Sequence, residues 1–177
     1  YRERLAGEIG RSRRYKRTFA IAVLDVDDFK AVNDRSGHAE GDRVLRRIAE
    51  IIRETLRDSD VAARWGGEEF AVLLTETAKR GAAIVVDRIR SRIEKQLAAD
   101  RVTVSGGVAA YPADGDREDD LFEFADRALY RAKAEGKNRI CVMPVERRAF
   151  PRLDENLPVR FKVLSETNGS VAGVTSN

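Results

Sequence analysis

The 177-residue sequence has few of the residues on which several common kinds of site depend. Cys141 is the only cysteine, which excludes an internal disulfide framework and suits a reducing compartment. His38 is the only histidine, and the absence of a second histidine or a nearby cysteine argues against a zinc site. The longest apolar run, residues 19–24, is far too short to span a bilayer. No signal peptide is visible, so we expect a soluble, cytoplasmic fragment that makes no membrane contact.

The sequence also has no large excess of either positive or negative charge, and its aromatic residues are few. The chain carries 33 basic and 30 acidic residues, and this balance argues only weakly for a nucleic-acid partner. Aromatic residues make up 7% of the chain, whereas a sheet that binds single-stranded nucleic acid needs exposed aromatics among basic residues. We therefore expect no nucleic-acid partner.

The hydrophobic pattern predicts one core built from strands and amphipathic helices. Apolar residues make up 42% of the chain, which is enough for such a core. Helices are predicted over residues 2–17, 39–56, 78–98 and 119–135, and strands over residues 19–24, 61–74 (a hairpin), 102–109 and 138–143. The order strand, helix, hairpin, helix, strand is the βαββαβ plan of ferredoxin-like folds, with an extra helix and strand. We expect an α+β fold with flanking helices, which cover one face of an antiparallel sheet.

The stretch Arg64-Trp65-Gly66-Gly67-Glu68-Glu69-Phe70 is predicted to be the turn of the hairpin. Glycines adopt positive φ angles readily and leave room for a phosphate to approach the backbone. A carboxylate held at such a turn can bind a hard cation such as Mg²⁺. A solvated hairpin tip remains an alternative interpretation of this stretch alone.

A second acidic stretch, Asp25-Val26-Asp27-Asp28, follows directly after the apolar run. Removing a carboxylate from water at the end of a buried strand is costly unless a cation is present, although a solvated loop is the alternative. Asp25 could meet Glu68 and Glu69 at one edge of the sheet. Such a set of carboxylates is what two-metal phosphoryl or nucleotidyl transfer requires. Asp42 lies in the first turn of a predicted helix, where the helix dipole alone could account for it.

These motifs resemble those of a known family. Gly66-Gly67-Glu68-Glu69-Phe70 matches the GGDEF/GGEEF signature of diguanylate cyclases. The other stretches that follow the family's pattern are residues 25–30, Asn33-Asp34, Gly37-His38, Gly41-Asp42 and residues 133–138. Residues 1–144 thus resemble a GGDEF catalytic domain, lacking only the family's opening segment ahead of Tyr1. The resemblance implies a fold of the nucleotidyl-cyclase and polymerase-palm type.

The resemblance also implies a role for each matching residue. Asp25 and Glu68 would bind Mg²⁺, or Mn²⁺ as an alternative, together with the backbone carbonyl of Val26. Glu69 would bind metal or activate the 3′-hydroxyl group. The implied catalytic residues are Asp25, Lys30, Glu68 and Glu69. The implied substrate-binding residues are Asp28, Phe29, Lys30, Asn33, Asp42, Gly66, Gly67, Lys133 and Lys137.

Asn33 and Asp42 would recognise guanine. The Asp42 carboxylate can accept hydrogen bonds from guanine N1–H and N2–H₂, where adenine presents acceptors instead. A subgroup of the family that makes mixed cyclic AMP-GMP carries serine at the position of Asp42, so Asp42 favours the all-guanine product.

The activity that the resemblance implies is the condensation of two GTP molecules into cyclic di-GMP and two pyrophosphates. Each domain binds one GTP, so a homodimer is needed, yet the sequence shows no clear dimerisation device. The alternative is a catalytically silent GGDEF-like sensor that binds GTP or cyclic di-GMP. Retention of Asp25, Glu68 and Glu69 argues against this alternative.

Two further motifs resemble cyclic di-GMP sites. Arg57-Asp58-Ser59-Asp60 matches the family's RxxD product-inhibition site, in which Arg57 and Asp60 would hold cyclic di-GMP, with Arg88 at the secondary position. Residues 145–177 resemble the beginning of a PilZ domain, a cyclic di-GMP receptor. The implied PilZ-like residues are Arg148, Arg152, Asn168, Ser170 and Gly173. This segment is too short to close the PilZ β-barrel, so we expect a partial domain.

Overall fold

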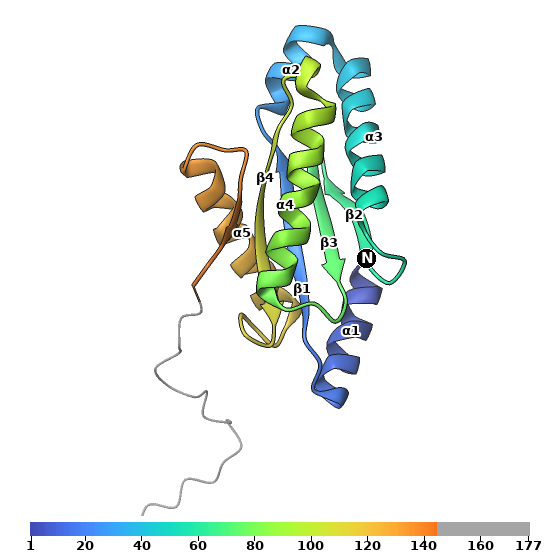
Figure 1. Cartoon of the computed structure of the whole chain (residues 1–177), viewed down its shortest axis with the longest axis vertical. Coiled ribbons are helices and arrows are strands. Elements are labelled where there is room, and N and C mark those ends of the chain that lie inside the picture. Colours follow the sequence, from blue (N-terminus) through green and yellow to red (C-terminus); the bar gives the residue numbers. More distant parts are fainter. Residues whose placement is uncertain (145–177) are drawn as a thin grey trace, which may run out of the picture. The chain divides into compact units, whose positions relative to one another are not determined.

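A computed structural model describes residues 1–144. The PilZ-like prediction for residues 145–177 therefore lies outside the described residues. The described elements, in chain order, are α1 (Arg2–Tyr15), β1 (Phe19–Val26), α2 (Phe29–Ser36), α3 (His38–Thr55), β2 (Val61–Gly66), β3 (Glu69–Leu74), α4 (Lys79–Gln96), the 3₁₀ turn η1 (Ala98–Asp100), β4 (Val104–Tyr111), α5 (Glu118–Ala134) and β5 (Ile140–Val142) (Figure 1).

The five strands form one sheet in the order β2-β3-β1-β4-β5. The central strand β1 is antiparallel to both β3 and β4. The α+β, ferredoxin-like prediction is confirmed. The sheet is not wholly antiparallel, however, because β5 pairs with β4 in parallel. The reason is that α5 crosses over between these two strands and returns the chain in the same direction.

Helices cover both faces of the sheet, so the prediction of a single covered face was wrong. One core cluster joins α3 and α4 to alternate residues of β1, and includes Ile48, Ile89 and Ala22. A second cluster joins α1 and α5 to the intervening residues of β1, and includes Leu5 and Ile21. Figure 1 shows α4 in front of the sheet and α5 behind it. All eight residues of β1 are buried, because helices cover both faces of the sheet at this central strand.

The helix α2 was not predicted, since residues 33–38 have the composition of a loop. Only Val32 of this helix is buried, so the sequence carries no apolar periodicity there. α2 begins directly after Asp28, whose backbone has the left-handed φ of 52°. This tight connection places the N-terminus of α2 beside the end of β1.

Close packing between β4 and α5 positions the end of α5 relative to the sheet. A Cβ atom at Gly107 of β4 would lie 1.9 Å from the Ala125 carbonyl oxygen and 2.4 Å from the Leu129 nitrogen. The absence of a side chain at Gly107 therefore lets α5 lie against the strand. As a result, Lys133 near the C-terminal end of α5 reaches the end of β1.

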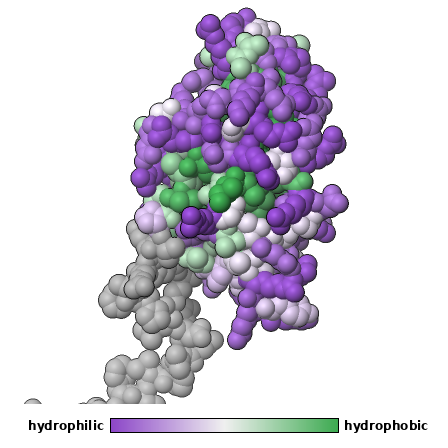
Figure 2. All heavy atoms as spheres, in the orientation of Figure 1, coloured by the Kyte–Doolittle hydropathy of each residue, from purple (hydrophilic) through white to green (hydrophobic). Residues whose placement is uncertain are grey.

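The face of the molecule seen in Figure 2 is largely hydrophilic, with a band of hydrophobic side chains across its middle. Within residues 1–144, no helix is both long and apolar enough to cross a membrane.

Candidate functional site

The end of β1 and the β2–β3 hairpin bring the predicted carboxylates together. β2 ends at Gly66 and β3 begins at Glu69, so that Gly67 and Glu68 form the turn. Asp25 of β1 pairs in register with Glu69 of β3. The Val26 N–H donates to the Glu68 carbonyl oxygen at 3.3 Å. The groups predicted to hold a metal ion therefore lie at one end of the sheet.

The negative charge of this region is only partly compensated. The Lys133 ammonium lies 2.7 Å from Asp25 Oδ1, and Asp25 is 8% exposed. Burial raises the pKa of Asp25, the Lys133 ammonium opposes this rise, and Glu68 adds to it. Burial likewise raises the pKa of Glu69, and the charges of Asp25 and Asp126 raise it further. The carboxylates thus lie near enough to disfavour one another's ionised forms.

These donors fit a hard divalent cation. Carboxylate and carbonyl oxygens are the ligands that Mg²⁺ prefers, and a cation would relieve the mutual repulsion of Asp25, Glu68 and Glu69. Within residues 1–144, however, no group of three or more histidine, cysteine or acidic side chains is already arranged as a metal site. The Asp25 carboxylate instead forms an ion pair with Lys133, so a bound cation would compete with this ammonium group.

A cavity of about 410 Å³ joins the hairpin turn to α2 and α3. Its volume is within the range of small-molecule sites, which is about 300–1,000 Å³. The predicted site residues that line it are Phe29, Lys30, Asn33, Asp42, Gly67 and Glu68. The predicted guanine-binding pair therefore shares one cavity with the signature turn. His38 also lines the cavity, although packing or helix capping was the role expected from the sequence.

The groups predicted to hold phosphates gather beside this cavity. The first N–H groups of a helix have no partners within the helix and attract phosphate, and α2 begins at Phe29. Lys137 Nζ lies 2.5 Å from Asp28 Oδ1, at the residue that precedes α2. Hydrogen bonding to Asp28 raises the pKa of the Lys137 ammonium, which therefore stays charged. Lys30 is exposed in the first turn of α2.

Asp27 is a structural centre of the site that the sequence did not single out. Its carboxylate is 6% exposed and accepts hydrogen bonds from the Thr103 hydroxyl (2.7 Å), the Ser105 hydroxyl (2.7 Å) and the Asn138 N–H (3.0 Å). These bonds tie the end of β1 to β4 and to the loop that carries Lys137. A polar Ser105 inside an otherwise apolar strand was the available signal.

Trp65 anchors the signature hairpin to the face of the sheet that α1 and α5 cover. Its ring stacks on Phe122 of α5 with the centroids 4.6 Å apart, and the Tyr1 ring meets it edge-on at 5.7 Å. The Arg2 guanidinium lies 5.1 Å from the centroid of the Trp65 ring. These contacts fix the hairpin immediately before Gly66 and Gly67.

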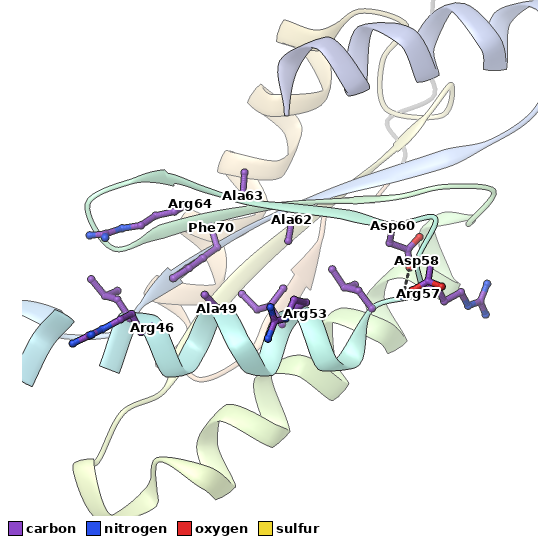
Figure 3. A pocket seen from close by; sticks show the side chains of 13 residues that line it. Arg46, Ala49, Arg53, Arg57, Asp58, Asp60, Ala62, Ala63, Arg64 and Phe70 are labelled. Atoms are coloured by element: carbon purple, nitrogen blue, oxygen red, sulfur yellow. Dashed lines mark hydrogen bonds between the residues drawn. The ribbon is translucent and has the colours of Figure 1, made fainter. Parts of the chain in front are cut away.

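The RxxD loop lies at the opposite end of α3 from Asp42. The Asp60 carboxylate accepts hydrogen bonds from the N–H groups of Arg57 and Thr75, both at 3.2 Å. Arg88 of α4 donates to the Thr55 carbonyl oxygen at 3.3 Å, at the C-terminal end of α3. The structure thus brings Arg57, Asp60 and Arg88 to one place. Arg57 and Asp60 also line one end of a cavity between α3 and the β2–β3 hairpin, and the side chain of Arg57 points away from that cavity (Figure 3).

Comparisons with known proteins identify relatives over the same residues. The family model "Diguanylate cyclase, GGDEF domain" matches residues 1–139. Diguanylate cyclase A of Treponema denticola is 44% identical over 130 residues, which are 71% of this chain and 35% of that protein. The chain therefore spans about a third of the length of this relative.

Solved structures of the family share the fold. The active GGEEF domain of a diguanylate cyclase from Vibrio cholerae matches with a TM-score of 0.73 at 30% identity, over 76% of this chain and 88% of that one. The GGDEF domain of DgcB from Caulobacter crescentus, solved in complex with cyclic di-GMP, matches with a TM-score of 0.71 at 32% identity, over 78% of this chain and 85% of that one. Together with the family model, these matches show that the chain belongs to the GGDEF family of diguanylate cyclases.

Proposed function

We propose that the protein is a diguanylate cyclase, which condenses two GTP molecules into cyclic di-GMP and two pyrophosphates. The observation that supports this most strongly is the cavity in which Asn33 and Asp42 face the signature turn at Gly67 and Glu68. It combines groups suited to guanine with groups suited to a metal-bound triphosphate. The Vibrio cholerae relative, described as an active GGEEF domain, supports activity with glutamate at both acidic signature positions.

Separate groups of residues bind the guanine base, the phosphates and the metal ion. Asn33 and Asp42 hydrogen-bond guanine, while the N-terminus of α2 and the lysines Lys30, Lys133 and Lys137 hold the β- and γ-phosphates. Asp25, Glu68 and the Val26 carbonyl would hold Mg²⁺, or Mn²⁺ in its place, which supplies positive charge against the triphosphate.

Each 3′-hydroxyl oxygen then attacks the α-phosphorus of the other GTP. A new O–P bond forms, the bond from that phosphorus to pyrophosphate breaks, and the hydroxyl proton passes to Glu69. The raised pKa of Glu69 suits it to this role, because a general base works best when its pKa approaches the operating pH. Two such steps close the ring of cyclic di-GMP.

Ring closure requires two copies of the chain, since each cavity holds one GTP. We propose a homodimer whose two cavities face each other during turnover. The described residues form one compact unit, and the Treponema relative is about three times as long as the matched segment. Parts of the full-length protein outside this segment could bring the two domains together.

We also propose product inhibition through Arg57, Asp60 and Arg88. The DgcB relative, solved in complex with cyclic di-GMP, supports binding of the product by a domain of this family. Arg57→Ala should relieve inhibition by cyclic di-GMP without raising the uninhibited rate, because Arg57 lies outside the nucleotide cavity. Unchanged inhibition in this variant would exclude the RxxD loop as the inhibitory site.

The test of the proposed activity is product analysis after incubation of the protein, at high concentration, with GTP and Mg²⁺. Cyclic di-GMP and pyrophosphate should form with the natural protein and not with Glu68→Ala. The competing function is a silent sensor, which would bind GTP or cyclic di-GMP without turnover. Calorimetric binding of GTP in the absence of any product, also in a forced dimer, would favour the sensor.

A further inference from the structure

A second cavity, of about 490 Å³, lies between α3 and the β2–β3 hairpin. We call it the α3–β2 groove. Its apolar lining comes from both walls (Figure 3), and includes Ala49 and Ile52 of α3, Leu56 directly after α3, Ala62 of β2 and Phe70 of β3. Along α3 the lining extends from residue 45 to residue 56, which is about 16 Å at 1.5 Å per residue. These dimensions suit a small molecule with an apolar body.

The groove carries arginines that have no carboxylate partner. Arg46 of α3 and Arg64 of β2 line the same end from opposite walls (Figure 3), and their Nε atoms donate only to the carbonyl oxygens of Asp42 and Gly67. Arg53 lines the groove farther along α3. None of these three arginines takes part in an ion pair within residues 1–144.

Two other arginines of α3 differ in this respect. Arg43 lies 2.6 Å from a Glu40 oxygen, and Arg47 lies 2.8 Å from a Glu50 oxygen. Neither arginine lines the groove. The uncompensated positive charge of α3 is therefore concentrated on the groove side, where it favours an anion.

We propose that the α3–β2 groove is a binding site for a small amphipathic anion. Its apolar body, two aromatic rings or a short aliphatic chain, lies against Ala49, Ala62 and Phe70. Its carboxylate, sulfonate or phosphate group lies between Arg46 and Arg64. The orientation follows from charge, because Asp58 and Asp60 line the opposite end of the groove and repel an anionic group there.

This site overlaps the two sites already described only at its two ends. The nucleotide cavity shares only Leu45 and Arg64 with the groove, and the signature carboxylates do not line the groove. Arg57 and Asp60 of the RxxD loop line the end of the groove away from Arg46 and Arg64, and the side chain of Arg57 points away from the groove (Figure 3). The proposal therefore does not rest on cyclase activity, and its test needs no turnover.

The test is a fluorescence titration with two probes that share their aromatic rings and differ in charge. 1-Anilinonaphthalene-8-sulfonate carries a sulfonate, whereas N-phenyl-1-naphthylamine is uncharged. The natural protein should bind the sulfonate probe at least fivefold more tightly than the neutral probe. Arg46→Gln/Arg64→Gln should weaken the sulfonate probe about fivefold, the effect of two exposed charge contacts of about 0.5 kcal/mol each, and leave the neutral probe unchanged.

Matched variants locate the binding. Arg43→Gln/Arg47→Gln removes the same charge from α3 outside the groove and should leave both affinities unchanged. Ala49→Phe fills the groove at an exposed position and should weaken both probes. Melting temperatures establish that each variant is folded.

Three results would overturn the proposal. The first is an equal loss of sulfonate binding in the two double-arginine variants. The second is equal affinity of the natural protein for both probes. The third is displacement of the sulfonate probe by cyclic di-GMP in the natural protein but not in Arg57→Ala. That result would assign the groove to the RxxD site.

Discussion

Gly41 should determine how well the protein binds GTP, although its own atoms have no part in recognition. A Cβ atom added to Gly41 of α3 would lie 2.0 Å from Asn33 Oδ1 and 3.1 Å from Phe29 Cζ. In Gly41→Ala the end of the Asn33 side chain must therefore rotate away from its present position. Asn33 is flexible and only partly buried, so this movement should not unfold the protein.

The size of the effect follows from the hydrogen bond that Asn33 would no longer make to guanine. Loss of one such bond costs about 1–3 kcal/mol, which corresponds to about a 5- to 150-fold weaker affinity for GTP. Stability should change little, because alanine gains about 1 kcal/mol over glycine within a helix and offsets the shift at Phe29. GTP binding by calorimetry and unfolding in urea measure the two quantities separately.

A double-mutant cycle tests the cause of the effect. Asn33→Ala should weaken GTP binding about as much as Gly41→Ala does, and the double variant should be little weaker than either, because both changes remove one interaction. Gly10→Ala is the matched control, since a Cβ atom there meets nothing within 4 Å. Full GTP affinity in Gly41→Ala, or additive losses in the double variant, would refute the reasoning.

Three further predictions concern residues that hold the site in place. Burial raises the pKa of Asp25, so its contribution to stability is present below its ordinary pKa of 3.8 and is lost as the pH rises through the raised pKa. Asp25→Asn without divalent cations should thus be more stable than the natural protein in urea at pH 7, with no difference near pH 3; lower stability at pH 7 would contradict this. Asp27→Asn should lower the unfolding free energy by about 1–3 kcal/mol and raise the KM for GTP, because Asp27 ties the end of β1 to the loop that carries Lys137; an unchanged KM would show that this contact does not affect substrate binding. Gly107→Ala should destabilise by about 1–3 kcal/mol or more in urea unfolding, because backbone atoms of α5 block the new methyl group, and unchanged stability would show that α5 can move freely.

Much of the fold follows from patterns within the sequence. The apolar run at residues 19–24 predicted the central strand, and the paired glycines at Gly66 and Gly67 predicted the hairpin turn at the right place. The amphipathic periodicity predicted α3, α4 and α5. α2 could not be predicted in this way, because it buries a single residue and begins from a left-handed backbone at Asp28.

The site was predictable only where neighbouring residues carry its chemistry. The acidic stretch at the end of β1 and the signature hairpin pointed to one edge of the sheet, and Asp25 and Glu69 indeed pair across adjacent strands. The hydrogen bonds that hold these residues in place could not be predicted from the sequence. Asp27 and Asn138 are 111 positions apart in the chain, and only the folded sheet brings them into hydrogen-bonding distance.

The central claim is that two copies of this domain, each holding one GTP, join them into a ring. The most direct measurement is product stoichiometry for a version fused to a constitutively dimeric coiled coil and incubated with GTP and Mg²⁺. The account predicts one cyclic di-GMP and two pyrophosphates for every two GTP consumed, and no product when Glu68→Ala is introduced into the same fusion. A folded fusion that binds GTP but forms no cyclic di-GMP would contradict it.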